Sequence, residues 1–175
     1  MWTSFIILSL VTLQRLAELY IAHRNTKRLI ASGGYEVGSG HYPLIVALHA
    51  LWLAGLWYFA WRLEVTWGWI FAYLVLEAAR GWIIAALGSR WTTRIIVMPG
   101  EPLVEEGPYR YFRHPNYMIV AGEIFILPMA FGLWWYALLF LILNGGLLYW
   151  RIRSEDEALK PLRERQAQLP DDPAA

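Results

Sequence analysis

The sequence predicts an all-α integral membrane protein with five transmembrane helices, the last two joined as a tight helical hairpin, and a short C-terminal helix. The first observation is composition: 58% of the 175 residues are hydrophobic, against about 45–50% in soluble domains. The second is that this excess is gathered into runs, most of them of roughly 18 residues or more, which is typical of membrane-spanning helices. The third is that basic residues follow alternate runs, as a chain that crosses a membrane repeatedly requires.

The first three runs cover about residues 2–22, 42–61 and 66–87. Each is about as long as a helix needs to be to cross a hydrocarbon core about 30 Å thick. The first run lacks a basic segment before it and a clear small-residue cleavage site after it. We therefore interpret it as a retained helix rather than a signal peptide.

The fourth and fifth runs cover about residues 116–131 and 133–150, with Gly132 between them. So short a connection predicts that the two helices pack against each other as a hairpin. The fourth run is short for a bilayer, and Pro128 near its end is expected to kink it.

The remaining segments do not read as spans. Residues 88–113 contain a cluster of helix breakers, and we expect the apolar stretch 95–98 to lie at the membrane surface. The residues from Gln166 onward are predicted to form a flexible tail. The chain is thus expected to be one domain over 1–175, with a three-helix part (1–87), a second functional part (88–165) and a tail (166–175). The breakers are Pro99, Gly100, Pro102, Gly107 and Pro108.

Basic residues set the expected orientation. They cluster after the first, third and fifth runs, whereas the opposite side carries little besides Arg62 and Glu64. By the positive-inside rule, the N-terminus lies outside and the C-terminus in the cytoplasm. We therefore expect an integral protein of the bacterial inner (plasma) membrane. An aromatic belt near the outer ends agrees with this orientation, and consists of Trp57, Trp61, Trp67, Trp69, Trp134 and Trp135.

Several function classes are excluded or left without support. A formal net charge of +1 gives no nucleic-acid-binding footprint. The absence of cysteine excludes disulfides, thiolate metal sites and a cysteine nucleophile. No cluster of residues has the spacing of metal ligands, so no metal is expected, and the sequence does not fix the oligomeric state.

A dense polar and aromatic cluster separates the third and fourth runs. Ionisable groups at a membrane edge indicate function, because they are costly to keep there. The hairpin brings the start of the fourth helix next to the end of the fifth, so His114, Asn116 and Tyr117 are expected to face Arg151 and Glu155. The alternative is a solvated helix end with an ion pair, in which Pro115 only begins the helix. The cluster reads Gly107-Pro108-Tyr109-Arg110-Tyr111-Phe112-Arg113-His114-Pro115-Asn116-Tyr117.

This cluster, followed by Arg151-Ile152-x-x-Glu155-Asp156, resembles the isoprenylcysteine carboxyl methyltransferase family over about residues 90–160. The resemblance implies an integral-membrane methyltransferase that uses S-adenosyl-L-methionine, bound by a loop on the cytoplasmic side. It places the substrate-binding arginine at Arg151. It places the cofactor contacts at Leu103, Val104, Tyr109, His114, Pro115, Asn116, Tyr117 and Glu155. Two positions depart from the pattern: Glu155-Asp156 replaces the usual acidic pair, and Glu101 stands where some members have a histidine.

The N-terminal half resembles a bacterial subset of the same family, the alkylpyrone O-methyltransferases. This likeness rests on Gln14-Arg15-Leu16-x-Glu18-Leu19, on Gly40-His41-Tyr42 and on Leu48-His49. It implies a different methyl acceptor: the enolic hydroxyl of a lipid-tailed pyrone in place of the carboxylate of a prenylated cysteine.

Both acceptors suit the residues. The methyl group on a sulfonium is already activated, so the protein mainly has to place an oxygen nucleophile in line with it. A carboxylate or an acidic enol is anionic near neutral pH, and Arg151 is suited to pair with that anion. Glu155 is suited to hydrogen-bond the cofactor, so Arg151 and Glu155 are the candidate catalytic residues. The lipid tail of the acceptor is expected to enter sideways from the surrounding membrane lipids.

Charged residues inside the predicted spans leave two possibilities open. Arg15 with Glu18, and Glu77 with Arg80, are each three residues apart, so each pair either neutralises itself as a structural lock or lines the acceptor pocket. Glu123 either pairs with Arg80 or binds substrate. His49, in mid-span, is expected to contact a ligand more readily than His41. We therefore include Arg15, Glu18, His49 and Glu123 with Arg151 as candidate substrate-binding residues.

Two rival functions remain. Membrane sterol and steroid reductases share a similar Arg-His-Pro-Asn-Tyr stretch and bind NADPH there, but many have a Gly-Glu pair closer to the tyrosine than Gly122-Glu123 is here. A small ion-coupled carrier is the other rival, with Glu18, Glu77 and Glu123 as coupling sites. Against it, the sequence shows no inverted repeat.

Overall fold

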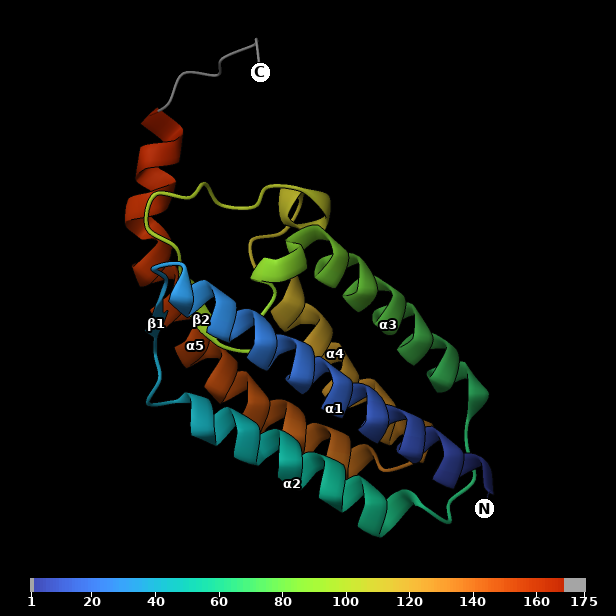
Figure 1. The fold of residues 1–175 in the computed structure, drawn as a ribbon. Helices are drawn as coiled ribbons and strands as arrows, with labels where there is room; N and C mark the ends of the chain where they lie inside the picture. Colours follow the sequence, from blue (N-terminus) through green and yellow to red (C-terminus); the bar gives the residue numbers. More distant parts are fainter. Residues whose placement is uncertain (1, 169–175) are drawn as a thin grey trace.

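The computed structural model describes residues 2–168 and is almost entirely helical (Figure 1). The long helices are α1 (Trp2–Ala31), α2 (Tyr42–Ala60), α3 (Trp67–Leu87), α4 (Pro115–Ala130) and α5 (Trp134–Gln168). Two short 3-10 helices, η1 (Gly88–Arg90) and η2 (Gly107–Arg110), and two strands, β1 (Tyr35–Val37) and β2 (Ile95–Val97), complete the described part.

Four of the helices are long and apolar enough to cross a membrane: α1, α2, α3 and α5. This confirms the predicted membrane-helix bundle in its coarse form. The remaining helix, α4, is apolar but has 16 residues, or about 24 Å at 1.5 Å per residue. That is less than the hydrocarbon core of about 30 Å, so a fifth crossing stays a prediction.

The helices run roughly side by side, and α4 packs against both α3 and α5. Only Phe131, Gly132 and Leu133 separate α4 from α5. Gly132 has a φ of +73°, which suits glycine because it has no Cβ to clash. Pro128 lies inside α4 near its C-terminal end, as the sequence indicated. The N-terminal end of α1 and the α2–α3 connection lie at one end of the bundle. The strands and the segment between β2 and α4, which holds the polar and aromatic cluster, lie at the other (Figure 1).

The small β-sheet was not predicted from the sequence. Strands β1 and β2 pair antiparallel, with Glu36 opposite Ile96, and Ile95 and Val97 are buried. The segment predicted to lie at the membrane surface thus contains a strand, and its position at the membrane surface stays a prediction. Three-residue strands are too short to show a reliable alternation of apolar and polar residues, and their partners are far apart in the sequence.

The C-terminal part also differs from expectation. The predicted short C-terminal helix is the continuation of α5, which runs unbroken through Pro161 to Gln168. Gln166 therefore belongs to a helix and not to the predicted flexible tail. The rest of that predicted tail, residues 169–175, lies outside the described residues.

The interior is apolar at both ends and charged in between. A large apolar cluster includes Leu8, Leu56 and Leu127, and a smaller one includes Ala22, Ile83 and Trp91. Glu18, Arg80 and Glu123 are buried as well. Large apolar side chains such as those of Leu10, Phe71 and Ile142 face outward, which is the arrangement that a lipid environment favours.

Candidate active site

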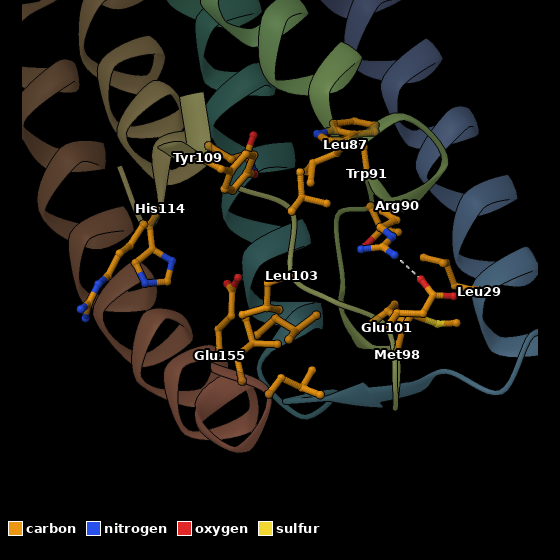
Figure 2. Close-up of a pocket in the computed structure, with 18 of the residues that line it drawn as sticks. Leu29, Leu87, Arg90, Trp91, Met98, Glu101, Leu103, Tyr109, His114 and Glu155 are labelled. Atoms are coloured by element: carbon orange, nitrogen blue, oxygen red, sulfur yellow. Dashed lines mark hydrogen bonds and ion pairs between the residues drawn. The ribbon is translucent and has the colours of Figure 1, made fainter. Parts of the chain in front are cut away.

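A cavity of about 380 Å³ opens among β2, the loops around η1 and η2, the start of α4 and the C-terminal part of α5 (Figure 2). Its volume falls within the range of about 300–1,000 Å³ typical of small-molecule sites. The lining includes both apolar and charged side chains. Eight of the nine residues predicted as cofactor contacts or as the substrate arginine line it: Leu103, Val104, Tyr109, His114, Asn116, Tyr117, Arg151 and Glu155.

The ninth residue, Pro115, is not among the cavity-lining residues. It is buried at the first position of α4, where its fixed φ and missing N–H are well tolerated. Pro115 thus helps to set the direction of the helix that carries Asn116 and Tyr117.

Tyr117, Arg151 and Glu155 form the centre of the polar wall. Arg151 Nε donates a hydrogen bond of 2.8 Å to the Tyr117 hydroxyl, which in turn donates to Glu155 Oε2. A second nitrogen of Arg151 donates to the backbone oxygen of Thr93 at 2.8 Å. The side chain of Arg151 is buried, and its partners on α4 and after η1 hold the guanidinium in one orientation. The predicted meeting of α4 and α5 residues is thus present.

His114 is held in place by Asp156 on α5. Its Nε2 lies 3.1 Å from Asp156 Oδ1, to which Arg163 also donates at 2.6 Å. Partial burial of Asp156 opposes its ionisation, but the hydrogen bond from Arg163 and the neighbouring His114 outweigh this effect and lower the pKa of that carboxyl. The His114 ring stacks on the Tyr117 ring with centroids 5.5 Å apart. Asp156 therefore orients His114 toward the cavity.

Two further groups in the cavity remain available as hydrogen-bond partners for a ligand. The Oδ1 atom of Asn116 is buried and has no partner among the described residues; such an atom is costly unless a ligand or water supplies a donor. Burial, together with the charge of Glu155, raises the pKa of Tyr109. Tyr109 therefore stays a neutral phenol that can donate a hydrogen bond.

Gln166 and Arg94 were not predicted as site residues, but Arg94 lines the cavity and Gln166 contacts the loop that forms its wall. The backbone N–H of Leu103 donates to Gln166 Oε1 at 3.0 Å, and Gln166 Nε2 donates to Glu105 at 2.8 Å. Arg94 pairs with Glu36 on β1 at 2.7 Å. A glutamine near the end of a predicted helix carries no local signal of such a contact.

The charged residues inside the spans form one network across α1, α3 and α4. Arg15 pairs with Glu18 at 2.7 Å, as the local spacing predicted. Glu77, however, contacts Arg15 at 3.1 Å, and Arg80 pairs with Glu123. The expected local lock between Glu77 and Arg80 is therefore wrong, because the partners come from neighbouring helices. The predicted alternative of a Glu123–Arg80 pair is present.

None of Arg15, Glu18, His49 and Glu123 lines the cavity described above. His49 Nδ1 lies 2.8 Å from the backbone oxygen of Ile45 on its own helix. Both oxygens of Glu123 are engaged by guanidinium groups, those of Arg80 and Arg15. These contacts favour a structural role, and contact with an acceptor stays a prediction for these four residues.

His41 is buried at the residue before α2. Its ring packs 5.3 Å from that of Trp150 and against Gly38. Gly38 has a φ of +66°, and a Cβ there would collide with the imidazole. Burial, with the charge of Arg151 second, lowers the pKa of His41, while Glu36 acts in the opposite direction.

Acid is therefore expected to destabilise the fold through His41. Its folded pKa lies below the unfolded value of about 6.5, so as the pH falls through that value the unfolded state takes up the proton more readily. Stability is then lost as the pH falls. Thermal unfolding in detergent between pH 7.5 and 5.5 should show a shallower loss for His41→Asn than for wild type. His23→Asn, at an exposed position on α1, is the control, and an unchanged slope for His41→Asn would contradict the assignment.

Comparison with known proteins identifies a family for this chain. The model of the isoprenylcysteine carboxyl methyltransferase (ICMT) family matches residues 69–161. Among curated proteins, the uncharacterized protein YpbQ of Bacillus subtilis (strain 168) is 34% identical over 166 residues, covering 89% of this chain and 96% of the relative. No solved structure matches the chain. The family match covers nearly all of α3, the segment between α3 and α4, the whole of α4 and most of α5. The match to the relative also includes the N-terminal helices.

Proposed function

The chain belongs to the isoprenylcysteine carboxyl methyltransferase family of membrane methyltransferases, and from this premise we propose that it transfers a methyl group from S-adenosyl-L-methionine to an oxygen of a lipophilic acceptor. The observation that carries the proposal is the convergence of Leu103, His114 and Glu155 from separate segments on one cavity. Glu155 on α5 stands far from the other two in the sequence, and the family resemblance predicts all three as cofactor contacts.

The residues around the cavity fit the cofactor. The unpartnered Oδ1 of Asn116 can accept a hydrogen bond from an amino or hydroxyl group of an adenosine. Tyr109 offers an aromatic face and a donor, and Trp91 and Leu87 add apolar surface nearby (Figure 2). When bound, S-adenosylmethionine supplies a methyl group already activated on a sulfonium.

The protein then has to orient the acceptor. Arg151 is buried but keeps donors beyond those used by Tyr117 and Thr93. In our proposal it pairs with the anionic oxygen of the acceptor and holds that oxygen toward the cofactor. Because the acceptor is anionic near neutral pH, a strong general base is not required. Two acceptors fit this chemistry: a prenylcysteine-type carboxylate and an alkylpyrone-type hydroxyl.

The membrane arrangement is part of the proposal. All the cavity segments lie at the end of the bundle where basic residues gather, and the N-terminus lies at the other end. We infer that the cavity faces the cytoplasm, with α4 as a fifth crossing. A site at the membrane edge lets a lipid tail stay among the membrane lipids while the polar end reaches Arg151.

Ligand binding tests the proposal. Titration calorimetry of the detergent-purified protein should show micromolar binding of S-adenosylhomocysteine and none of NADPH. His114→Ala should weaken that binding about tenfold or more, because it removes a side chain of the cavity wall. His23→Ala, an exposed histidine on α1, should leave it unchanged. Binding of NADPH instead would move the chain toward the reductases, and binding of neither compound would contradict the cofactor assignment.

A further inference from the structure

Arg90 and Glu101 form an ion pair at one side of the cavity. Arg90 ends η1, and Glu101 lies in the loop that follows β2. Their side chains pair directly and are 32% and 44% exposed, so both remain open to a ligand. Figure 2 shows them on the opposite side of the cavity from His114 and Glu155, with Leu103 between.

This pair differs from the other charged groups of the cavity. Arg94 is paired with Glu36, and Arg163 with Asp156, and neither carboxylate partner lines the cavity. Over residues 2–168, Arg90–Glu101 is the one ion pair of which both members line it. The cavity lining thus carries a positive and a negative group next to each other at this place.

Both members keep hydrogen-bonding capacity. One nitrogen of Arg90 donates to the backbone oxygen of Pro102 at 2.6 Å and another to Glu101. A guanidinium has five N–H donors, and a carboxylate accepts at about four positions. The bond to Pro102 fixes the guanidinium independently of Glu101. A ligand can therefore engage both side chains without first dismantling the pair.

We propose that Arg90 and Glu101 bind the zwitterionic amino-acid end of the cofactor, Arg90 its carboxylate and Glu101 its ammonium. The assignment rests on the proposed function. The cofactor carries these two opposite charges on one carbon, and an adjacent guanidinium and carboxylate match them in sign and in number. Arginine suits a carboxylate in particular, because its planar fork can make two parallel hydrogen bonds.

The same pairing accounts for the departure at position 101. A neutral histidine, present there in some members of the family, offers one acceptor and no charge. Glu101 offers a full negative charge, which only a cationic partner such as an ammonium uses fully. With Arg90 it forms a pair that has no net charge of its own, as suits a zwitterion.

The test compares two ligands that differ only at this end. S-adenosylhomocysteine carries the amino-acid group, and 5′-methylthioadenosine lacks it. Glu101→Gln and Arg90→Gln should each raise the Kd for S-adenosylhomocysteine about tenfold and leave the Kd for 5′-methylthioadenosine within about twofold of wild type. Retained 5′-methylthioadenosine binding also shows that each variant is folded. Glu106→Gln, at an exposed position of the same loop, is the matched control.

Decarboxylated S-adenosylmethionine separates the two roles. It lacks the carboxylate but keeps the ammonium, so Arg90→Gln should not weaken its binding, whereas Glu101→Gln should. An equal loss for S-adenosylhomocysteine and 5′-methylthioadenosine would overturn the assignment and place the pair at the adenosine end. Unchanged S-adenosylhomocysteine binding in both variants would overturn it and leave the proposed function standing. Failure of the wild type to bind either adenosine compound would overturn the proposed function and this assignment together.

Discussion

Replacing Arg151 with alanine is expected to lower kcat/KM for methyl transfer by roughly 100-fold to 1,000-fold. Truncating one partner of a buried, hydrogen-bonded charge pair costs about 2–5 kcal/mol, and each 1.36 kcal/mol corresponds to about a tenfold change in rate. Arg151 is buried with 6% of its surface exposed, so the anionic oxygen of the acceptor would lose its proposed partner where water cannot replace it. The measurement is the rate of methyl transfer to a prenylcysteine analogue and to an alkylpyrone.

The cofactor-binding step separates this effect from unfolding. Arg151 supports Tyr117 through a 2.8 Å bond, so affinity for S-adenosylhomocysteine should fall by less than about tenfold in Arg151→Ala. Arg151→Lys keeps the charge but not the planar fork and should give an intermediate rate. The matched control is Arg153→Ala, two residues along the same helix but exposed, which should keep the wild-type rate. A folded Arg151→Ala variant with full activity would contradict the proposed role.

Replacing Glu123 with alanine is expected to destabilise the helix bundle by about 3–5 kcal/mol, the usual cost of breaking a buried ion pair from one side. Glu123 is 3% exposed and accepts hydrogen bonds from Arg80 Nε at 2.7 Å and from Arg15 at 2.9 Å. Without it, two guanidinium groups inside the membrane-spanning region depend on Glu18 and Glu77 alone. Thermal or denaturant unfolding in detergent measures the loss.

Two further variants identify the cause of the lost stability. Glu123→Gln keeps the shape and one acceptor oxygen but loses the charge and the second acceptor, so it should be destabilised less than Glu123→Ala. Glu64→Ala removes a carboxylate at an exposed position between α2 and α3 and should change stability by less than about 0.5 kcal/mol. Wild-type stability in Glu123→Ala, combined with a raised KM for the acceptor, would instead favour the substrate-binding alternative.

Much of the fold could be predicted because it depends on local properties of the chain. Long apolar runs predicted α1, α2, α3 and α5 as membrane helices, and the single glycine between the last two runs predicted that α4 and α5 would be neighbours. The convergence of Tyr117 with Arg151 and Glu155 followed from that connection alone. The motif supplied the rest of the cavity wall, since a family pattern records residues that share a ligand even when they are distant in the sequence.

Other features depended on contacts that no local pattern encodes. Strands β1 and β2 are too short to show a period, and only their mutual pairing stabilises them. Gln166 was predicted to belong to a flexible tail, whereas in the fold its side-chain amide hydrogen-bonds to Leu103 and Glu105. Arg90 gave no signal of a role, because its position across from Glu101 depends on the path of the chain through η1 and β2.

By itself the sequence determined that the chain is a membrane-embedded helical protein of this family, and it predicted most of the polar residues that line one cavity, because hydropathy and a spaced motif are properties of the chain. Only the tertiary structure decided how the buried charges are shared. The spacing of Glu77 and Arg80 suggested a local pair. A buried charge is costly unless it is paired, and the packing of the helices brings Arg15 next to Glu77 and Glu123 next to Arg80. Pairing across helices follows from packing, which a single helix cannot reveal.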